Sequence, residues 1–212
     1  MAFVLIGTDY REVPLEDLDL LSQARESIET ALVSNNSQTS ISGAVILSTC
    51  NRFEIYLDCD DFETASKHAI ATIAEQANLA PEYCGQIFKA VSDSTAAQHL
   101  FSVTSGLESM VIGEEEIAGQ VKRAFTSSQQ SGHASTGLVQ AFQKAAEVAK
   151  KITTETGLGS AGRSTITVAL DYLEQRHGSH AGKQALLIGT GAHARVVVAA
   201  LKRSEIGRAS CR

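Results

Sequence analysis

The sequence predicts a mixed α/β chain, with an N-terminal α+β domain, long connecting helices and the first strand–helix unit of a second α/β domain. Three observations carry this prediction. Strand-like apolar runs occupy residues 3–7 and 45–57. Apolar residues recur at helical spacing through 117–125 and 138–152. A last apolar run, 183–188, leads directly into a helix-like stretch.

Local signals predict the elements between these landmarks. In chain order we expect a helix from about 13 to 33, a Ser- and Asn-rich loop at 34–42, a strand pair around residue 50, a helix at 62–78 and a short strand at 86–90. Further on we expect a helix through 96–101, a segment at 106–113 between two glycines, and helices beginning near 114 and 163. We place the domains at 1–156, 157–181 (a helical linker) and 182–212.

Composition excludes several classes of function. The chain has 212 residues and a net charge of −6, with 43% hydrophobic and 20% charged residues, so it has no general basic field for nucleic acid. Any RNA would have to be held by a local patch. The four cysteines show neither metal-ligand nor disulfide spacing, which favours reduced thiols, no metal site and a cytoplasmic location. We find no signal peptide and no apolar run near the ~20 residues that span a bilayer, so we expect no membrane partner.

The stretch around Cys50 is the first candidate site. The apolar run ends in Ser-Thr-Cys-Asn-Arg, and alternation resumes from Phe53. This pattern predicts a strand, a tight connection and a second strand, with Cys50 at the connection. A thiol can attack a substrate, and the Arg52 guanidinium suits a carboxylate. The alternative is a half-buried cysteine beside an ordinary surface arginine.

Three further groups lie downstream. His99 is a lone histidine on an expected helix, for which a structural role is the simpler interpretation. Segment 106–113 can run close to a ligand, because glycine tolerates unusual torsions. The acidic triplet 114–116 begins a helix, where acids are stabilising against the positive end of the helix dipole. Gln120 lies one helical turn beyond the end of this triplet.

A glycine pattern follows the last predicted strand. Residues 189–194 read Gly-Thr-Gly-Ala-His-Ala, a G-x-G-x-x-A pattern between a strand and a helix. In that context the pattern predicts the first β-α unit of a Rossmann-type nucleotide-binding domain, with a pyrophosphate at the helix N-terminus. Residues 204–212 show no strand-like run, and one strand with one helix cannot form a parallel sheet. We therefore expect a C-terminally truncated domain that leaves Leu186 uncovered. The last eight residues resemble translated adapter sequence and are expected to be foreign.

Together the motifs at 48–52, 106–122 and 189–194 resemble glutamyl-tRNA reductase. The resemblance covers residues 1 to about 203 and is most specific in the first two motifs. It implies an N-terminal catalytic domain, an NADPH domain, and a C-terminal helical domain that forms a homodimer in the intact enzyme. This chain resembles the first, part of the second and none of the third.

The resemblance also assigns roles residue by residue. It makes Cys50 the nucleophile and His99 a histidine important for activity. It matches substrate-binding positions to Thr49, Asn51, Arg52, Ser109, Glu114, Glu115, Glu116 and Gln120. It matches the NADPH loop to Gly189, Thr190, Gly191, Ala192, His193 and Ala194. This chain departs from many relatives in having Glu115-Glu116 in place of Pro-Gln, and in residues 8–11, where a Ser-His pair is usual.

The implied reaction is the first step of five-carbon tetrapyrrole (porphyrin and haem) biosynthesis. A thiolate at Cys50 attacks the ester of glutamyl-tRNA(Glu), a thioester forms, and NADPH reduces it to glutamate-1-semialdehyde. An unperturbed thiol has a pKa of about 8.5, so we expect a local positive charge or a base, which Arg52 or His99 could supply, to favour the thiolate. One alternative is a non-reducing fragment that only binds aminoacyl-tRNA or a regulatory protein. Another is a different NAD(P)-dependent, cysteine-dependent aldehyde enzyme.

Overall fold

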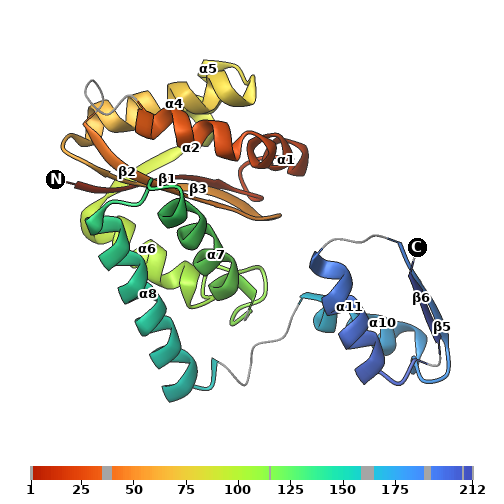
Figure 1. The fold of residues 1–212 in the computed structure, drawn as a ribbon. Coiled ribbons are helices and arrows are strands. Elements are labelled where there is room, and N and C mark those ends of the chain that lie inside the picture. Colours follow the sequence, from red (N-terminus) through yellow and green to blue (C-terminus); the bar gives the residue numbers. More distant parts are fainter. Residues whose placement is uncertain are drawn as a thin grey trace.

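The computed structural model describes residues 2–34, 40–114, 116–158, 165–188, 192–206 and 208–211 (Figure 1). In residues 2–158 a four-stranded antiparallel sheet lies between two layers of helices. The C-terminal part contains two further helices and a two-stranded parallel sheet. The chain is therefore mixed α/β, as the sequence predicts.

The four-stranded sheet has the order β2-β3-β1-β4. Its strands are β1 (Ala2–Asp9), β2 (Ile41–Ser48), β3 (Arg52–Cys59) and β4 (Lys89–Ser92). The predicted pair around residue 50 is confirmed, because β2 and β3 form an antiparallel hairpin that aligns Ser48 with Phe53. The short connection left between them holds Cys50.

The alternation of side chains along β3 divides the interior into two cores. Phe53, Ile55 and Leu57 point into one apolar cluster, against α1 (Leu15–Gln23), α2 (Arg25–Ser34), α4 (Phe62–Ala77) and α5 (Pro81–Ile87). Tyr56 points into the other cluster, against α6 (Asp93–Thr104), α7 (Glu116–Gln130) and α8 (Thr136–Glu155). Figure 1 shows these two helical layers on opposite faces of the sheet. Arg52 and Glu54 share the face of Tyr56, because side chains alternate with a period of two residues.

Some predicted elements need correction. The single helix expected from 13 to 33 is two helices that meet at Ala24, whose backbone N–H caps α1 by bonding to the carbonyl of Leu20. The strand expected at 86–90 begins at Lys89, because α5 occupies the residues before it. Pro81 is the first residue of α5, where its missing N–H costs nothing.

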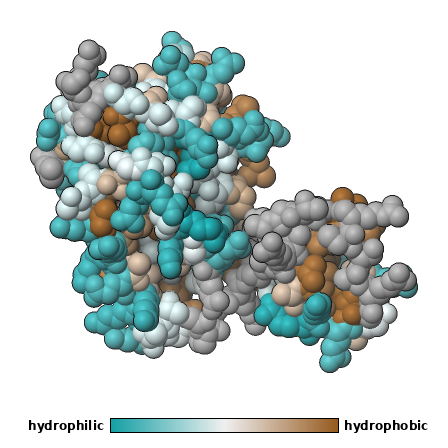
Figure 2. All heavy atoms as spheres, in the orientation of Figure 1, coloured by the Kyte–Doolittle hydropathy of each residue, from teal (hydrophilic) through white to brown (hydrophobic). Residues whose placement is uncertain are grey.

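The C-terminal part contains α10 (Thr165–His177), β5 (Gln184–Leu187), α11 (Ala192–Arg203) and β6 (Arg208–Cys211). The prediction that the tail has no strand is wrong, because β6 pairs in parallel with β5. Large apolar side chains stay exposed here, Leu186 at 63% and Ile188 at 80%. Figure 2 shows hydrophobic residues, in brown, at the surface of this part. No helix in the described ranges has the length and apolar character needed to cross a bilayer.

Candidate active site

The connection that carries Cys50 is built by Thr49. Its Oγ1 accepts hydrogen bonds from the backbone N–H groups of Asn51 (3.1 Å) and Arg52 (3.2 Å). Its own N–H donates to the Arg52 carbonyl at 3.0 Å, and Tyr10 N–H donates to the Asn51 carbonyl at 3.0 Å. A threonine hydroxyl that bonds two following N–H groups stabilises a turn. The Thr49 side chain and the Asn51 backbone therefore fix the shape of the connection.

Cys50 is exposed at this turn, as a nucleophile requires. Partial burial raises the pKa of its thiol, and the negative charges of Glu114 and Glu116 raise it further. Our expectation of positive charge beside the sulfur is thus wrong, because the strongest charge effects on this thiol come from carboxylates. The other two cysteines in residues 2–158, Cys59 and Cys84, are buried.

Arg52 begins a buried polar network on the same strand. Its Nη1 donates to Glu54 Oε1 at 2.7 Å, and its Nη2 donates to the backbone carbonyl of Glu108. His99 Nε2 lies 2.8 Å from the same Glu54 oxygen, and Tyr56 Oη donates to Glu54 Oε2 at 2.7 Å. Arg52 is only 4% exposed and Glu54 only 3%. Four side chains from β3 and α6 thus form one hydrogen-bonded group, which we call the Glu54 network.

Electrostatics in the Glu54 network follow from its contacts. Burial alone would raise the pKa of the Glu54 carboxyl, but the His99 hydrogen bond and the Arg52 charge outweigh it and hold that pKa below its usual value. Burial and the Glu54 charge together raise the pKa of Tyr56 well above its usual value. The network therefore contains a carboxylate, a guanidinium and a neutral phenol. The role of Arg52 toward a substrate carboxylate stays a prediction, since Glu54 is its carboxylate partner here.

Segment 106–114 closes over the network. Gly106 and Gly113 have φ values of 75° and 82°, in the left-handed region that favours glycine, and Gly113 N–H donates to the Gly106 carbonyl at 2.9 Å. The turn brings the Glu108 carbonyl to Arg52 and sets Glu108 Oε2 4.0 Å from the Arg11 guanidinium. The unusual torsions expected at these glycines are present, whereas a close approach to a ligand stays a prediction. Ser109 lies on this segment, half-buried.

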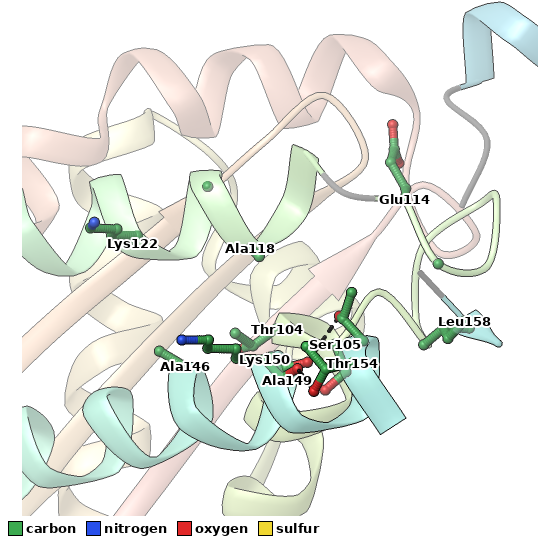
Figure 3. Close-up of a pocket in the computed structure, with 13 residues that line it drawn as sticks. Thr104, Ser105, Glu114, Ala118, Lys122, Ala146, Ala149, Lys150, Thr154 and Leu158 are labelled. Carbon is green, nitrogen blue, oxygen red and sulfur yellow. Dashed lines mark hydrogen bonds between the residues drawn. The ribbon is translucent and has the colours of Figure 1, made fainter. Parts of the chain in front are cut away.

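Three cavities surround this region. His99 and Glu54 line the first, of about 420 Å³, together with Asp9, Arg11, Glu12 and Lys89. Lys122 and Lys150 line the second, of about 390 Å³, with Glu114 (Figure 3). Arg25, Ser48, Gln120 and Arg123 line the third, of about 380 Å³. The predicted site residues are therefore distributed: His99, Glu114 and Gln120 each line a different cavity, and Cys50 is not among the lining residues of these three.

Several predicted residues lie outside the described ranges, namely Glu115, Gly189, Thr190 and Gly191. Ala192, His193 and Ala194 form the first turn of α11. The sequence reasoning missed Glu54 and Tyr56. A signal for both was present, because period-two alternation places them on the face of Arg52.

Most of this chain matches one family of known proteins. Residues 6–156 match the family model described as the N-terminal domain of glutamyl-tRNA(Glu) reductase. The chain belongs to the glutamyl-tRNA reductase family. The match covers the hairpin, the Glu54 network, segment 106–114 and helices α6 to α8.

Individual proteins that this chain resembles are named glutamyl-tRNA reductase. The glutamyl-tRNA reductase of Clavibacter michiganensis subsp. michiganensis is 39% identical over 204 residues, which are 94% of this chain and 46% of that protein. That of Micrococcus luteus is 41% identical over 210 residues, with the same coverage. The solved structure of the enzyme from Methanopyrus kandleri superposes with a TM-score of 0.62 at 28% identity, covering 99% of this chain and 48% of that one. The chain therefore spans about half the length of its reductase relatives.

Proposed function

We propose that this chain provides the acyl-transfer site of a glutamyl-tRNA reductase. In this proposal the Cys50 sulfur attacks the ester carbonyl of glutamyl-tRNA(Glu), the S–C bond forms, and the C–O bond to the ribose breaks. The thiol proton ends on the ribose oxygen that leaves, and the glutamyl group stays on Cys50 as a thioester. The observation that carries the proposal is an exposed thiol on a rigid turn beside a buried polar network, inside the region that matches the family.

The residues around the thiol have distinct roles in this proposal. Glu114 and Glu116 disfavour a free thiolate, but a carboxylate near the sulfur can accept the proton while the S–C bond forms. The Glu54 network holds Arg52 and His99 in fixed positions through charge-assisted hydrogen bonds. Ser109, on the segment that covers Arg52, and Gln120, on α7, are proposed to contact the substrate.

Reduction requires NADPH, which when bound would supply the hydride that converts the thioester to glutamate-1-semialdehyde. We propose that Gly189, Thr190, Gly191, Ala192, His193 and Ala194 hold it, as the first β-α unit of a Rossmann domain. The supporting observation is that β5 ends at Leu187 and α11 begins at Ala192, so the glycine motif stands in the sequence between a strand and a helix N-terminus. The division at 1–156, 157–181 and 182–212 belongs to this proposal, as does a homodimer in the intact enzyme.

Acyl transfer is testable without reduction. Glutamyl-tRNA(Glu) with a radiolabelled glutamyl group is mixed with the chain, and label on protein is counted after denaturing precipitation. We expect label that neutral hydroxylamine removes, as it removes a thioester, and none on Cys50→Ser. Cys59→Ser is the matched control, because its thiol is buried away from the turn. No label on wild type would contradict the proposal.

A binding module is the second candidate, and the raised pKa of Cys50 is the observation that favours it. The same experiment separates the two functions. Tight binding of glutamyl-tRNA, unchanged in Cys50→Ser and with no label on wild type, would show a module that holds the RNA without attacking its ester.

A further inference from the structure

Lysines and arginines in residues 2–158 differ in whether they have a carboxylate partner. In residues 2–158 most lysines and arginines have a carboxylate oxygen within 4.0 Å: Arg11, Arg25, Arg52, Lys67, Lys89, Lys144 and Lys151. Within that part of the described chain, no ion pair forms at Lys122, Arg123 or Lys150. All three lie on α7 or α8, so within residues 2–158 the cations without a carboxylate partner are on two neighbouring helices.

Two of these cations share one cavity. Lys122 from α7 and Lys150 from α8 line the space of about 390 Å³ between α6, α7 and α8. Figure 3 shows both ammonium groups on one side of the cavity, with Glu114 and Leu158 on the other. Small residues, such as Ala118 and Ala146, line the space between them and leave room for a ligand. Among the described residues that line the cavity there are two ammonium groups and one carboxylate, that of Glu114.

A buried hydroxyl supplies an independent sign of a ligand. Ser105 lines this cavity and is only 7% exposed, and its Oγ has no hydrogen-bond partner. A buried polar atom that makes no hydrogen bond is costly, so such atoms usually have a partner. Thr153 and Thr154 also line the cavity, but their hydroxyls donate to backbone carbonyls of α8. Two unpaired ammonium groups and the Ser105 hydroxyl therefore form the donor set, which suits a phosphate.

The cavity and the surroundings of Cys50 share the residue Glu114. Gly113 and Glu114 line it, and the Glu114 charge acts on the Cys50 thiol. Segment 106–114, which ends there, also contacts Arg52 through the Glu108 carbonyl. A ligand in the cavity would therefore lie beside the groups that surround the nucleophile.

We propose that the cavity lined by Lys122, Lys150 and Ser105 binds a phosphate group of the 3′-terminal strand of the RNA substrate. This inference rests on the proposed function, since it needs an RNA ester at Cys50. The chain has a net charge of −6, so a polyanion requires a local site where positive charge is unpaired. A strand whose terminal ribose lies at the sulfur must place its next phosphates nearby. The Lys122–Lys150 cavity has the unpaired charge, and its lining residue Glu114 acts on the Cys50 thiol.

The test compares lysines inside and outside the cavity. The probe is a fluorescent acceptor-stem minihelix ending in CCA, and its Kd for the 212-residue chain is measured by anisotropy at several salt concentrations. We expect Lys122→Gln and Lys150→Gln each to raise the Kd roughly fivefold. Each should also lower the slope of log Kd against log salt concentration by about one. Lys144→Gln is the matched control, because it makes the same charge change on α8 at a lysine paired with Glu147. It should leave Kd unchanged.

A second measurement uses wild-type protein alone. Acetylation of lysines with and without the minihelix, followed by peptide mass analysis, should show protection of Lys122 and Lys150 but not Lys144. Equal loss of binding in all three variants, or no protection, would overturn the proposal. Loss of NADPH binding, with RNA binding intact, would assign the cavity to a dinucleotide instead and also overturn it.

Cys50 labelling separates this proposal from the proposed function. Label on Cys50 in wild type, with RNA affinity unchanged in both cavity variants, would reject the phosphate site and leave acyl transfer standing. RNA binding that depends on Lys122 and Lys150, with no label on Cys50, would support the phosphate site and reject acyl transfer.

Discussion

Cys50 and Arg52 lie two positions apart in one hairpin, yet their environments are opposite. The Cys50 thiol is exposed, and its strongest electrostatic neighbours are the carboxylates of Glu114 and Glu116. The Arg52 guanidinium is 4% exposed and bonds to Glu54 and to the Glu108 carbonyl. Closeness in the sequence therefore does not give Cys50 and Arg52 the same role. Their local contacts determine which residue is reactive and which is structural.

This difference teaches how a reactive turn is supported. A nucleophile has to reach its substrate, so it contributes little to packing. The groups that hold its backbone in place have to be buried and satisfied, because a buried unpaired charge is costly. We therefore expect substitutions at Arg52 and Glu54 to act mainly on stability, and substitutions near Cys50 to act mainly on reactivity.

The largest expected effect on stability is at Arg52. Arg52→Ala leaves the Glu54 carboxylate buried with one charged partner fewer, and loss of a buried partner costs about 3–5 kcal/mol of unfolding free energy. Urea denaturation followed by circular dichroism measures this loss. Lys67→Ala is the control, because both partners of the Lys67–Glu63 pair are exposed, and such pairs contribute about 0–1 kcal/mol. Equal losses of unfolding free energy in the two variants would contradict the structural role that we assign to the buried Glu54 network.

The next effect is a pH dependence from Glu54. Its pKa is lowered in the folded protein, so its contribution to stability is present above the unfolded value of about 4.3 and is lost as pH falls through the folded pKa. Glu54→Gln should be less stable than wild type at pH 7, and the difference should narrow below about pH 4. Urea midpoints from pH 3 to 7 test this. The urea midpoints of Glu63→Gln, which changes an exposed pair with Lys67, should vary with pH as those of wild type do. The same pH dependence for Glu54→Gln would contradict the assignment of this stability effect to Glu54.

A smaller effect concerns thiol reactivity. Removing a negative charge near Cys50 lowers the pKa of its thiol, so Glu116→Gln should increase iodoacetamide labelling of Cys50 at pH 7 by roughly two- to fivefold. Peptide mass analysis identifies the labelled cysteine. Cys59, whose pKa is raised to about 11 by burial and then by Asp58, should stay unlabelled in both proteins. An unchanged or slower rate at Cys50 would show that Glu116 does not act on the thiol.

The smallest effect is the stability of Cys50→Ser. An exposed turn side chain outside the core should change the unfolding free energy by less than about 0.5 kcal/mol. Thr49→Val is the informative comparison, because it removes the hydroxyl that bonds two backbone N–H groups of the turn. We expect it to cost about 1–2 kcal/mol in the same urea measurement. A Cys50→Ser loss as large as that of Thr49→Val would mean that the thiol is structural.

The sequence predicted the elements whose patterns are long. The helices with apolar stripes formed where expected, with Leu138, Phe142 and Ala145 buried on α8. The hairpin was predictable because alternation stops and resumes on either side of Cys50. The strand β6 was missed, because its residues Arg208–Cys211 carry no apolar run and pair through the backbone with β5.

The candidate site was predictable in part. The exposed cysteine and the glycine-flanked segment came from local patterns. The contact of His99 with Glu54 joins residues 45 positions apart, and no local pattern encodes such a pair. The carboxylates near Cys50 were visible as a triplet, but helix-dipole stabilisation was already a sufficient explanation of them. Their action on the thiol depends on how segment 106–114 folds back, which sequence spacing does not set.

One measurement tests the central claim most directly. Wild-type chain is mixed with glutamyl-tRNA(Glu), quenched in acid within seconds, digested and mapped by mass spectrometry. We predict a glutamyl adduct on the peptide containing Cys50 and on no other cysteine peptide, with none in Cys50→Ser. An adduct on Cys59 or Cys84, or no adduct while the RNA is bound, would contradict the claim that this turn carries the nucleophile.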